Sequence, residues 1–338
     1  MKESVLLAFS GGMDSRTAAR LLLEEYEVES LTLDTTGDAD LLLSAKRYAT
    51  ELGIEHSSLD VQAEFRHRII DYFTDSYAAG RTPAPCTVCN PMIKWRYLID
   101  EADRRGIEHV ATGHYFNIER YNNHLYVARA DDSRKDQSYY LWGLSQHVLQ
   151  RALTPMGHVI KDNIRSGFTH AKESMGLCFL RGESYRDYIG RTQPALTLKG
   201  DVVDTEGRKV GSHAGVAFYT IGQKRGFECE LSGVAVVGID AAMNRIIVGK
   251  DAELYHSTLE INDCNIVDKE EFMQADDVHV VIRGIGRNPQ EYMRRAEPSD
   301  EGYRIHLNDP AWAPAAGQPV VFYRQNRVIG GGIVERYY

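Results

Sequence analysis

The sequence predicts an α/β domain built on a parallel sheet, followed by a small β-rich linking domain and a C-terminal β-barrel. Two observations lead to this fold class. Up to about residue 185, short apolar segments alternate with longer helix-like segments, which is typical of βαβ units. Beyond that point, short strands and turns replace the helices. A chain of 338 residues is long enough for two or three such domains.

The first domain is expected to span residues 1–185. Its strands are expected at 5–9, 28–33, 56–59 and 109–112. Its helices are expected at 15–26, 39–52, 63–79, 91–105, 145–153 and 162–172, with a hairpin around Asn122-Asn123. Gly53, Gly80 and Gly106 are placed to end three of these helices. Because ligands of parallel sheets bind at the carboxyl ends of the strands, the segments 10–15 and 112–114 are expected at the binding edge.

The remaining elements are expected to be antiparallel strands. They lie at 202–203, 234–239, 245–249, 278–283, 319–323 and 328–334, with turns at Glu206-Gly207, 241–244 and Gln325-Asn326. We place the linking domain at 186–255 and the β-barrel at 256–338.

Composition limits the class of protein. No run of about 18 apolar residues occurs, and the chain enters a core strand directly after Lys2-Glu3, so neither a membrane span nor a signal peptide is expected. The cytoplasm is the default location. Five cysteines are too few and too unevenly spaced for a disulfide scaffold, so functional cysteines are expected to be catalytic or metal-bound.

The acidic charge is concentrated at one end of the chain. Residues 1–80 carry 15 acidic and 7 basic side chains, a balance of −8 within a total of −9. The basic groups beyond residue 80 are therefore the candidates for contact with a polyanion, and Lys224 and Arg225 are among them.

The strongest motif follows the first strand. Ser10-Gly11-Gly12-Met13-Asp14-Ser15 connects an apolar strand to a helix, and such a loop binds anions because glycines and uncapped N–H groups face the ligand. Neither a Walker A pattern nor G-x-G-x-x-G occurs. The loop resembles the PP-loop of ATP pyrophosphatases, which split ATP between the α and β phosphates and adenylate a carbonyl oxygen of the substrate. An ordinary glycine-rich turn is the weaker interpretation, since strand, loop and helix fit together.

A second motif is Cys86-x-x-Cys89, in a proline-stiffened loop expected between two helices. Its two sulfurs can reach one metal, one cluster or each other, and no second ligand pair lies nearby in the sequence. Cys178 stands between Leu177 and Phe179, where a buried small hydrophobe is the commoner interpretation. Cys229 and Cys264 carry no motif and are taken as structural.

Six motifs together resemble the tRNA-specific 2-thiouridylases. In order they are residues 10–15, the Gly-Arg-Thr-Pro-x-Pro loop with Cys89-Asn90, 111–115, 135–139, 176–179 and 220–226, and the closing Gly330-Gly331-Gly332 hairpin is also similar. The resemblance implies a cytoplasmic transferase that uses ATP to replace the 2-oxygen of the wobble uridine of certain tRNAs with sulfur, on a three-domain chain.

The resemblance also implies roles for particular residues. ATP and Mg²⁺ are the expected cofactors, with Asp14 as the acid linked to Mg²⁺, and Lys135, Asp136 and Gln137 would contact tRNA near a flipped base. Cys89 matches the family's nucleophile, and Cys178 the cysteine that carries a persulfide sulfur. The nucleotide would be held by Ala8, Phe9, Ser10, Gly11, Gly12, Met13, Asp14 and Ser15, with Leu33 and Gly113 nearby.

One position departs from the family pattern. Many relatives carry an acid three residues before the nucleophile, where this chain has Cys86. Cys86, Cys89 and Cys178 instead resemble the three thiolate ligands of thiolases that bind a [4Fe-4S] cluster. The sequence favours the cluster, and the persulfide route stays open.

Two other functions compete with thiolation. A PP-loop amidotransferase or ligase with a nitrogen nucleophile would keep residues 10–15 but would not need the three cysteines. A tRNA-binding protein without catalysis would need neither Asp14 nor the cysteines. The expected partners of the thiolase are tRNA and a sulfur-delivery protein or other persulfide donor, and the sequence makes no prediction of oligomeric state.

Overall fold

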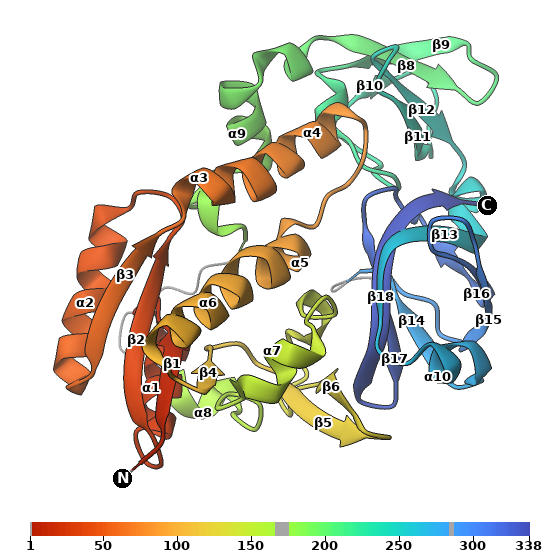
Figure 1. Ribbon diagram of the computed structural model, residues 1–338. Coiled ribbons are helices and arrows are strands. Elements are labelled where there is room, and N and C mark those ends of the chain that lie inside the picture. Colours follow the sequence, from red (N-terminus) through yellow and green to blue (C-terminus); the bar gives the residue numbers. More distant parts are fainter. Residues whose placement is uncertain (1, 166–175, 284–286) are drawn as a thin grey trace. The chain divides into compact units, whose positions relative to one another are not determined.

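The computed structural model describes residues 2–165, 176–283 and 287–338 (Figure 1). Its contacts divide the chain into two compact units. The first unit comprises Met1–Ile69, Cys86–Met175 and Asn326–Ile329, and the second comprises Ile70–Pro85, Gly176–Gln325 and Gly330–Tyr338.

A five-stranded parallel sheet forms the centre of the first unit, which confirms the predicted fold class. The sheet order is β3-β2-β1-β4-β7. All neighbouring strands are parallel. The bounds are β1 Ser4–Ala8, β2 Glu27–Asp34, β3 Glu55–Asp60, β4 His109–Ala111 and β7 Ala152–Leu153. The sequence did not reveal β7, because residues 145–153 were expected to be one helix.

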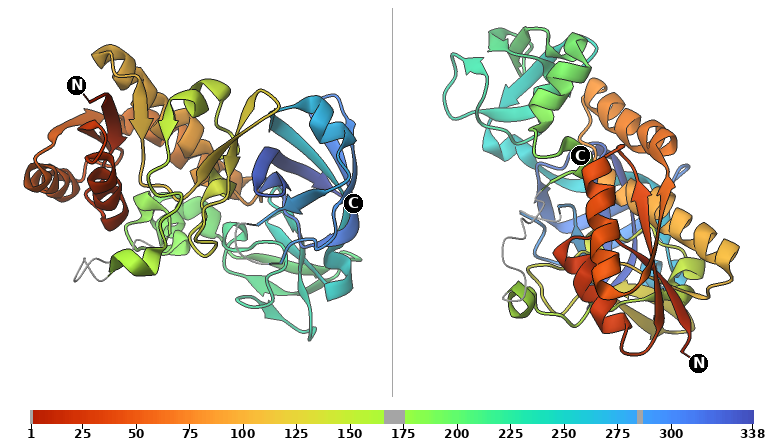
Figure 2. Two further views of the ribbon diagram at one scale, coloured as in Figure 1. Left: turned by 90° about the horizontal axis from the view of Figure 1, so that it is seen from below. Right: turned by 90° about the vertical axis from the view of Figure 1, so that its left-hand side faces the viewer.

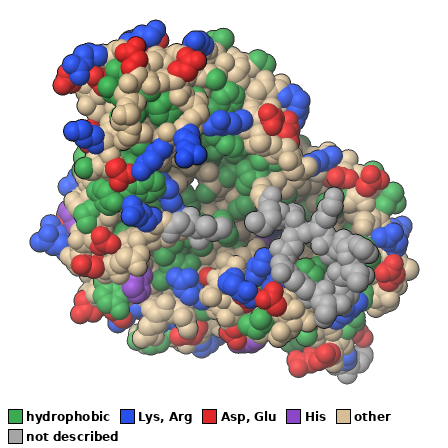
Figure 3. Space-filling view, turned by 180° about the vertical axis from the view of Figure 1, so that it is seen from behind, with side chains coloured by type: hydrophobic (Ala, Val, Ile, Leu, Met, Phe, Trp, Pro, Cys, Tyr) green, Lys and Arg blue, Asp and Glu red, His purple; other side chains and the backbone are tan. Residues whose placement is uncertain are grey.

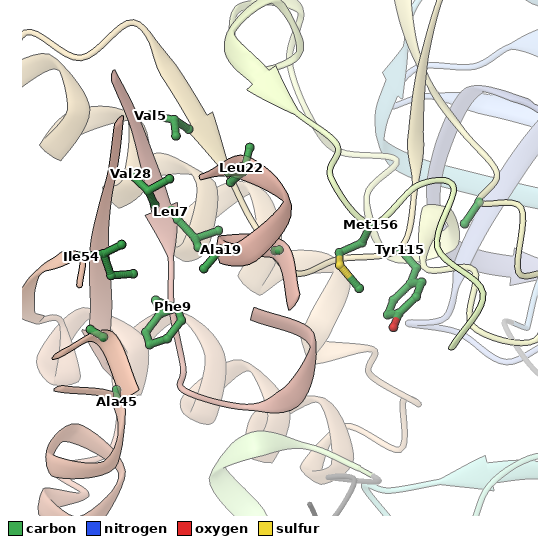
Figure 4. Packing of buried hydrophobic residues seen from close by; sticks show 14 residues of the cluster. Val5, Leu7, Phe9, Ala19, Leu22, Val28, Ala45, Ile54, Tyr115 and Met156 are labelled. Atoms are coloured by element: carbon green, nitrogen blue, oxygen red, sulfur yellow. The ribbon is translucent and has the colours of Figure 1, made fainter. Parts of the chain in front are cut away.

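Helices cover both faces of this sheet. Helices α1 (Met13–Leu22) and α2 (Ala39–Leu52) pack through Ala18, Ala19 and Ala45 against the face that carries Val5, Leu7 and Phe9. Figure 4 shows Ala19 and Leu22 directed toward this strand. Helix α6 (Arg96–Arg105) lies on the opposite side of the sheet from α2 (Figures 1 and 2).

Three glycines end helices as predicted. Gly53 follows α2 and Gly106 follows α6, and both have left-handed φ angles, 69° and 70°. Gly80 follows α4 (Tyr72–Ala78) after one further residue, with φ 70°. Since only glycine adopts this conformation without a Cβ penalty, these positions were readable from the sequence.

Two predicted helices have different boundaries in the structure. Residues 63–79 form α3 (Gln62–Phe65), a π-helical segment η1 (Arg66–Asp71) and α4 in succession. The helix expected from residue 91 begins earlier, as α5 (Pro85–Cys89), and continues through the π-helical η2 (Asn90–Trp95) into α6. Pro85 starts this run because proline is favoured in the first turn of a helix.

The rest of the first unit carries shorter elements. They are β5 Asn117–Tyr121, β6 His124–Ala128, η3 Ser138–Tyr140, α7 Gln146–Arg151 and α8 Lys161–Arg165. The hairpin β5–β6 turns at Asn122 and Asn123, as expected. Most of the helix expected at 162–172 lies outside the described residues.

The second unit contains a sheet of order β10-β9-β8-β12-β11. It has one parallel pair, β8 with β12, among antiparallel ones. The bounds are β8 Gly200–Asp204, β9 Lys209–His213, β10 Glu228–Cys229, β11 Ala235–Asp240 and β12 Arg245–Gly249. Its core contains Val202, Val236 and Ile246, which are fully buried.

The C-terminal strands of this unit form an antiparallel sheet of order β14-β17-β18-β13-β16-β15. The bounds are β13 Tyr255–Ile266, β14 Val278–Val281, β15 Met293–Pro298, β16 Tyr303–Trp312, β17 Pro319–Arg324 and β18 Arg327–Tyr337. The antiparallel character is confirmed. Among the described residues, the pairings leave β14 and β15 at the two ends and do not close a barrel.

Helices α9 (Tyr185–Thr192) and α10 (Lys269–Gln274) and several single 3₁₀ turns complete the second unit. Within the described ranges, no helix combines the length and the apolar character needed to cross a bilayer.

Candidate functional site

The loop between β1 and α1 has the features of an anion site. Gly12 occupies the N-cap of α1 and offers no side chain to cap the N–H groups of the first turn. The loop is held from within, because the Ser15 hydroxyl donates to the Gly12 carbonyl at 3.0 Å. Uncapped N–H groups at the start of a ten-residue helix attract negative charge.

Glycine is required at two points around this loop. Gly11 has φ +71°, and a Cβ there would lie 2.9 Å from Ala45 Cα. Gly113, just after β4, lies so close to α1 that a Cβ would come within 2.9 Å of the Ser15 backbone nitrogen. Two glycines therefore keep the backbone open at the helix N-terminus, a cradle that suits the phosphates of ATP.

The expected nucleotide residues come together at one edge of the sheet. Ala8 ends β1, Leu33 lies near the end of β2, and Gly113 follows β4, so all three belong to the carboxyl ends of neighbouring parallel strands. This is the edge at which open α/β sheets bind their ligands.

Asp14 lies in the first turn of α1 and is already engaged by two partners. Its Oδ1 accepts a hydrogen bond from the Tyr115 hydroxyl at 2.8 Å and pairs with the Lys161 ammonium at 2.5 Å. The Lys161 side chain is 4% exposed, whereas that of Asp14 is 38% exposed. The sequence did not reveal Lys161 as a site residue, since a single lysine at the start of a short helix carries no motif.

The carboxylate of Asp14 also fits Mg²⁺. This ion typically binds through one or two protein carboxylates together with phosphate oxygens and water. Within residues 2–165, 176–283 and 287–338, no three His, Cys, Asp or Glu side chains gather into a group that could hold a metal ion without such help.

His114 stands beside this edge as a neutral ring. Its Nδ1 pairs with the Thr112 hydroxyl at 2.9 Å, and its backbone N–H donates to the same oxygen at 3.2 Å. Burial lowers the pKa of His114 well below its usual value, and the charge of Lys94 adds to this effect. His114 therefore offers hydrogen bonds rather than a positive charge.

The segment expected to contact tRNA, residues 135–137, is held in place mainly by hydrogen bonds to nearby residues of the protein. Asp136 accepts hydrogen bonds from the backbone of Ala130 at 3.0 Å and from the Ser138 hydroxyl at 2.7 Å. Gln137 bonds Tyr115 twice, through its backbone N–H and its side-chain oxygen, both at 2.9 Å. Asp136 and Gln137 thus shape the loop, and their contact with tRNA stays a prediction.

Asp132 anchors the start of the same segment. Its buried carboxylate accepts from the backbone N–H of Lys161 at 2.9 Å and from that of Arg134 at 3.2 Å. The N–H of Lys161 is the main cause that holds the pKa of Asp132 below its usual value. The Asp132 carbonyl accepts from the N–H of Lys135 at 2.9 Å.

Cys86 and Cys89 lie on helix α5, not in the loop that was expected. The prolines were interpreted as loop formers, but Pro85 begins a helix, so the two cysteines are one turn apart on the same helix face. Cys89 is buried, with 5% exposure, and Cys86 is half-buried. Burial raises the pKa of Tyr140, and the nearby Cys86 adds to the shift.

Cys178 begins a single 3₁₀ turn, η4 (Cys178–Leu180), in the second unit. Phe179 is buried and packs edge-on against Phe73 at 5.2 Å between ring centroids. Cys178 itself is exposed, so the interpretation as a buried small hydrophobe is wrong. An exposed thiol held by a buried neighbour is accessible to a sulfur donor.

None of the five cysteines forms a disulfide. Thiols are suitable ligands for an iron-sulfur cluster. However, the described residues assemble no three-ligand group, so the cluster stays a prediction from the sequence. Burial raises the pKa of Cys264 to about 11, consistent with a structural thiol.

Lys224 and Arg225 are exposed on the loop between Gly222 and Gly226. Both glycines have positive φ angles, +88° and +94°, which gives the loop its shape. Lys224 pairs with Asp251 at 2.8 Å, and its side chain is 56% exposed. Exposed pairs of this kind are weak, so a phosphate can replace the carboxylate at little cost.

A cavity of about 580 Å³ adjoins this loop in the second unit. It is lined by Thr197, Lys199, Ser212, His213, Ala214, Gly226, Phe227 and Glu228. On the face drawn in Figure 3, Lys and Arg side chains stand in several separate groups, with Asp and Glu side chains among and around them. The positive charge is thus distributed in local groups, as the sequence suggested.

Three family models match the chain in sequence. They are a tRNA methyl transferase HUP domain over residues 3–182, a tRNA methyl transferase PRC-barrel domain over 186–250, and an aminomethyltransferase β-barrel domain over 256–334.

Similar curated proteins cover almost the whole chain. A tRNA-specific 2-thiouridylase MnmA 3 of Bacteroides fragilis is 39% identical over 99% of this chain and 95% of its own length. MnmA 1 of the same species is 38% identical over 98% of this chain and 96% of its own. MnmA 3 of Phocaeicola vulgatus is 35% identical over 98% and 94%. The relatives are named for thiolation, whereas the first two models are named for methyl transfer.

Proposed function

This chain belongs to the tRNA-specific 2-thiouridylase family, and we propose that it uses ATP to replace the 2-oxygen of the wobble uridine of tRNA with sulfur. The observation that carries the proposal is the glycine cradle at the uncapped start of α1, next to Asp14. We also propose the domain boundaries 1–185, 186–255 and 256–338.

The first step activates the base. The 2-oxygen of uridine attacks the α-phosphorus of ATP, an O–P bond forms, and pyrophosphate leaves. The N–H groups of residues 13–15 stabilise negative charge on the phosphates, since such donors are already oriented before the reaction. Asp14 would hold Mg²⁺, and that ion would supply positive charge to the leaving pyrophosphate.

The second step delivers sulfur. In the persulfide route, the terminal sulfur on Cys178 attacks C2 of the adenylated uridine and AMP leaves. The thiolate of Cys89 then attacks the Sγ of Cys178, which releases the thiolated base and leaves a Cys89–Cys178 disulfide. One sulfane sulfur is reduced while two thiols are oxidised, so a reductant must reopen the disulfide before the next cycle.

A [4Fe-4S] cluster held by Cys86, Cys89 and Cys178 would be the other source of sulfur, and it is the one that the sequence favours. Three thiolates would leave one iron open for a sulfur atom. The two routes share the activated uridine and differ in their need for Cys86.

A nitrogen-transferring amidotransferase or ligase is the second candidate. The nucleotide loop alone suits it equally well, because adenylation precedes attack by either nucleophile. The exposed Cys178 and the Cys86–Cys89 pair favour sulfur, since neither is needed by a nitrogen nucleophile.

With tRNA as substrate, we propose that the protein works in the cytoplasm with a persulfide donor.

The test combines purified protein, unmodified tRNA, ATP, Mg²⁺ and a persulfide donor. We expect AMP and pyrophosphate to form with tRNA present, and nucleoside mass spectrometry to find 2-thiouridine at the wobble position. Asp14→Ala is expected to stop pyrophosphate release. Formation of ADP and orthophosphate, or of a methylated or aminated nucleoside, would contradict the proposal.

A further inference from the structure

We propose that Tyr115 and Lys161 are positioning residues that couple occupancy of the nucleotide loop to the placement of the segment 135–137. This inference rests on the proposed function, because it takes that segment as a tRNA contact. Two separate paths of hydrogen bonds connect Asp14 to the segment, and both begin at the same atom, Asp14 Oδ1.

The first path runs through Tyr115. Its hydroxyl donates to Asp14, and its backbone N–H and C=O are both bonded by Gln137. Tyr115 is 2% exposed and belongs, with Met156, to the buried cluster that includes Val5 and Leu7 (Figure 4). Since the ring is fixed by packing, movement of its hydroxyl and movement of its backbone are linked.

The second path runs through Lys161. Its ammonium pairs with Asp14, while its backbone N–H bonds the buried carboxylate of Asp132. Asp132 in turn accepts from the backbone of Arg134 and Lys135. The ammonium also lies 5.4 Å from the centre of the Tyr115 ring, so the two paths are adjacent.

Nucleotide binding is expected to change the charge at the Asp14 carboxylate, where both hydrogen-bond paths begin. If Asp14 binds a divalent cation, its negative charge is shared with that ion, and the ammonium of Lys161 is repelled. The nearest alternative anion would be the phosphate group in the adjoining cradle. Lys161 is therefore expected to move from Asp14 toward phosphate, and the Tyr115 bond to Asp14 to change with it.

Such a link is reciprocal. If ATP changes the affinity for tRNA by some factor, tRNA must change the affinity for ATP by the same factor. We expect a factor of roughly 5 to 150, the usual range for coupled sites. This coupling between ATP and tRNA binding would favour adenylation only when tRNA is in place.

The test measures tRNA binding with and without Mg²⁺ and an ATP analogue whose α,β bridge cannot be cleaved. Wild-type protein is expected to bind tRNA more tightly with the analogue. Tyr115→Phe keeps the ring and removes only the hydroxyl, so the protein should fold and bind each ligand alone while the coupling factor falls toward one. Lys161→Met should also reduce coupling, and Lys161→Arg should restore part of it.

Tyr26→Phe is the matched control, because Tyr26 packs against the same buried cluster but precedes β2, at the opposite end of the strand from the nucleotide edge. Amide exchange at Gln137 gives a readout independent of activity, and we expect it to change when the analogue binds wild type but not Tyr115→Phe. Unchanged coupling in Tyr115→Phe, or no coupling in an active wild type, would overturn the inference. Wild-type protein that neither thiolates nor binds tRNA would instead refute the proposed function.

Discussion

The carboxylate of Asp14 and the ammonium of Lys161 meet at 2.5 Å although 147 positions separate them in the sequence. The two partners have unequal surroundings, since the lysine side chain is almost fully buried and the aspartate is more than one-third exposed. This asymmetry determines what happens when either side of the pair is removed.

We predict that Asp14→Ala destabilises the protein more than Lys161→Met. The first change leaves a buried ammonium without its carboxylate, whereas the second leaves a carboxylate that water can reach. The exposure of Asp14 screens the pair, so we expect Asp14→Ala to lower the free energy of unfolding by only about 1–3 kcal/mol. Urea unfolding of both single variants and of the double variant measures this free energy. A double variant less stable than Asp14→Ala would contradict the assignment.

We predict that Gly113→Ala weakens nucleotide binding without unfolding the domain. The added Cβ would come within 2.9 Å of the Ser15 backbone, and backbone cannot yield as a flexible side chain can. Displacement of the loop should lower kcat/KM for ATP by roughly tenfold to a hundredfold.

The control for this prediction is Gly190→Ala. Gly190 lies within helix α9, and the nearest atom to an added Cβ would be 3.9 Å away. This change should leave the kinetics unaltered. Equal kinetics in the two variants would mean that Gly113 does not border the nucleotide.

The strand, loop and helix of the proposed nucleotide edge were predictable from the sequence because their signals are local, while nucleotide binding itself stays a prediction. A strand, a glycine loop and a helix start lie within one short segment around residues 10–15, and Gly113 belongs to a second short motif. Lys161 could not be found in this way, since its role depends on a contact with a residue far away in the chain. The same reason explains why β7 was missed, because a two-residue strand forms only where β4 offers it a partner.

The cysteine motif shows that a local sequence rule can leave two structures open. Prolines at 83 and 85 suggested a stiff loop, yet proline is equally compatible with the first turn of a helix. The tertiary structure selects the second option at Pro85 and places Cys86 and Cys89 on α5. The family resemblance assigned Asp136 and Gln137 to contact with tRNA, and the structure shows hydrogen bonds from both to their own loop and to Tyr115, so the tRNA contact stays a prediction.

We predict that tRNA binding weakens steeply with salt and depends on Lys224 and Arg225. Each lost phosphate contact should reduce the slope of log K against log salt by about 0.7–0.9. Lys224→Ala and Arg225→Ala should therefore reduce both affinity and slope for all tRNAs tested. Lys46→Ala, in the acidic N-terminal region, serves as the control and should change neither. An affinity that is constant across salt concentrations would exclude the proposed surface.

We predict that the thiols react with iodoacetamide in a fixed order. Cys178 is exposed and should be alkylated first, whereas burial raises the pKa of Cys264 to about 11. A raised pKa means less thiolate at any given pH, so at pH 8 only about 0.1% of Cys264 would be ionised. Its rate should increase as the pH rises toward 11. Peptide mass spectrometry after timed labelling gives the order, and early labelling of Cys264 would contradict the structure.

The last prediction concerns Cys86, on which the two sulfur routes make opposite demands. In the persulfide route, Cys178 and Cys89 suffice, and Cys86→Ala should retain most of the activity. In the cluster route, each of Cys86→Ala, Cys89→Ala and Cys178→Ala should abolish thiolation, and protein purified without oxygen should be brown with broad iron-sulfur absorption.

Because Cys86 replaces the acid of many relatives and lies one helical turn before Cys89, we expect the cluster outcome. Cys229→Ser is the control, since Cys229 lies on β10 and belongs to neither route. Pyrophosphate release should persist in every cysteine variant, because adenylation precedes sulfur transfer, and its loss would indicate misfolding rather than a missing ligand. Full activity of a colourless, iron-free preparation supplied with a persulfide donor would exclude the cluster and establish the disulfide route.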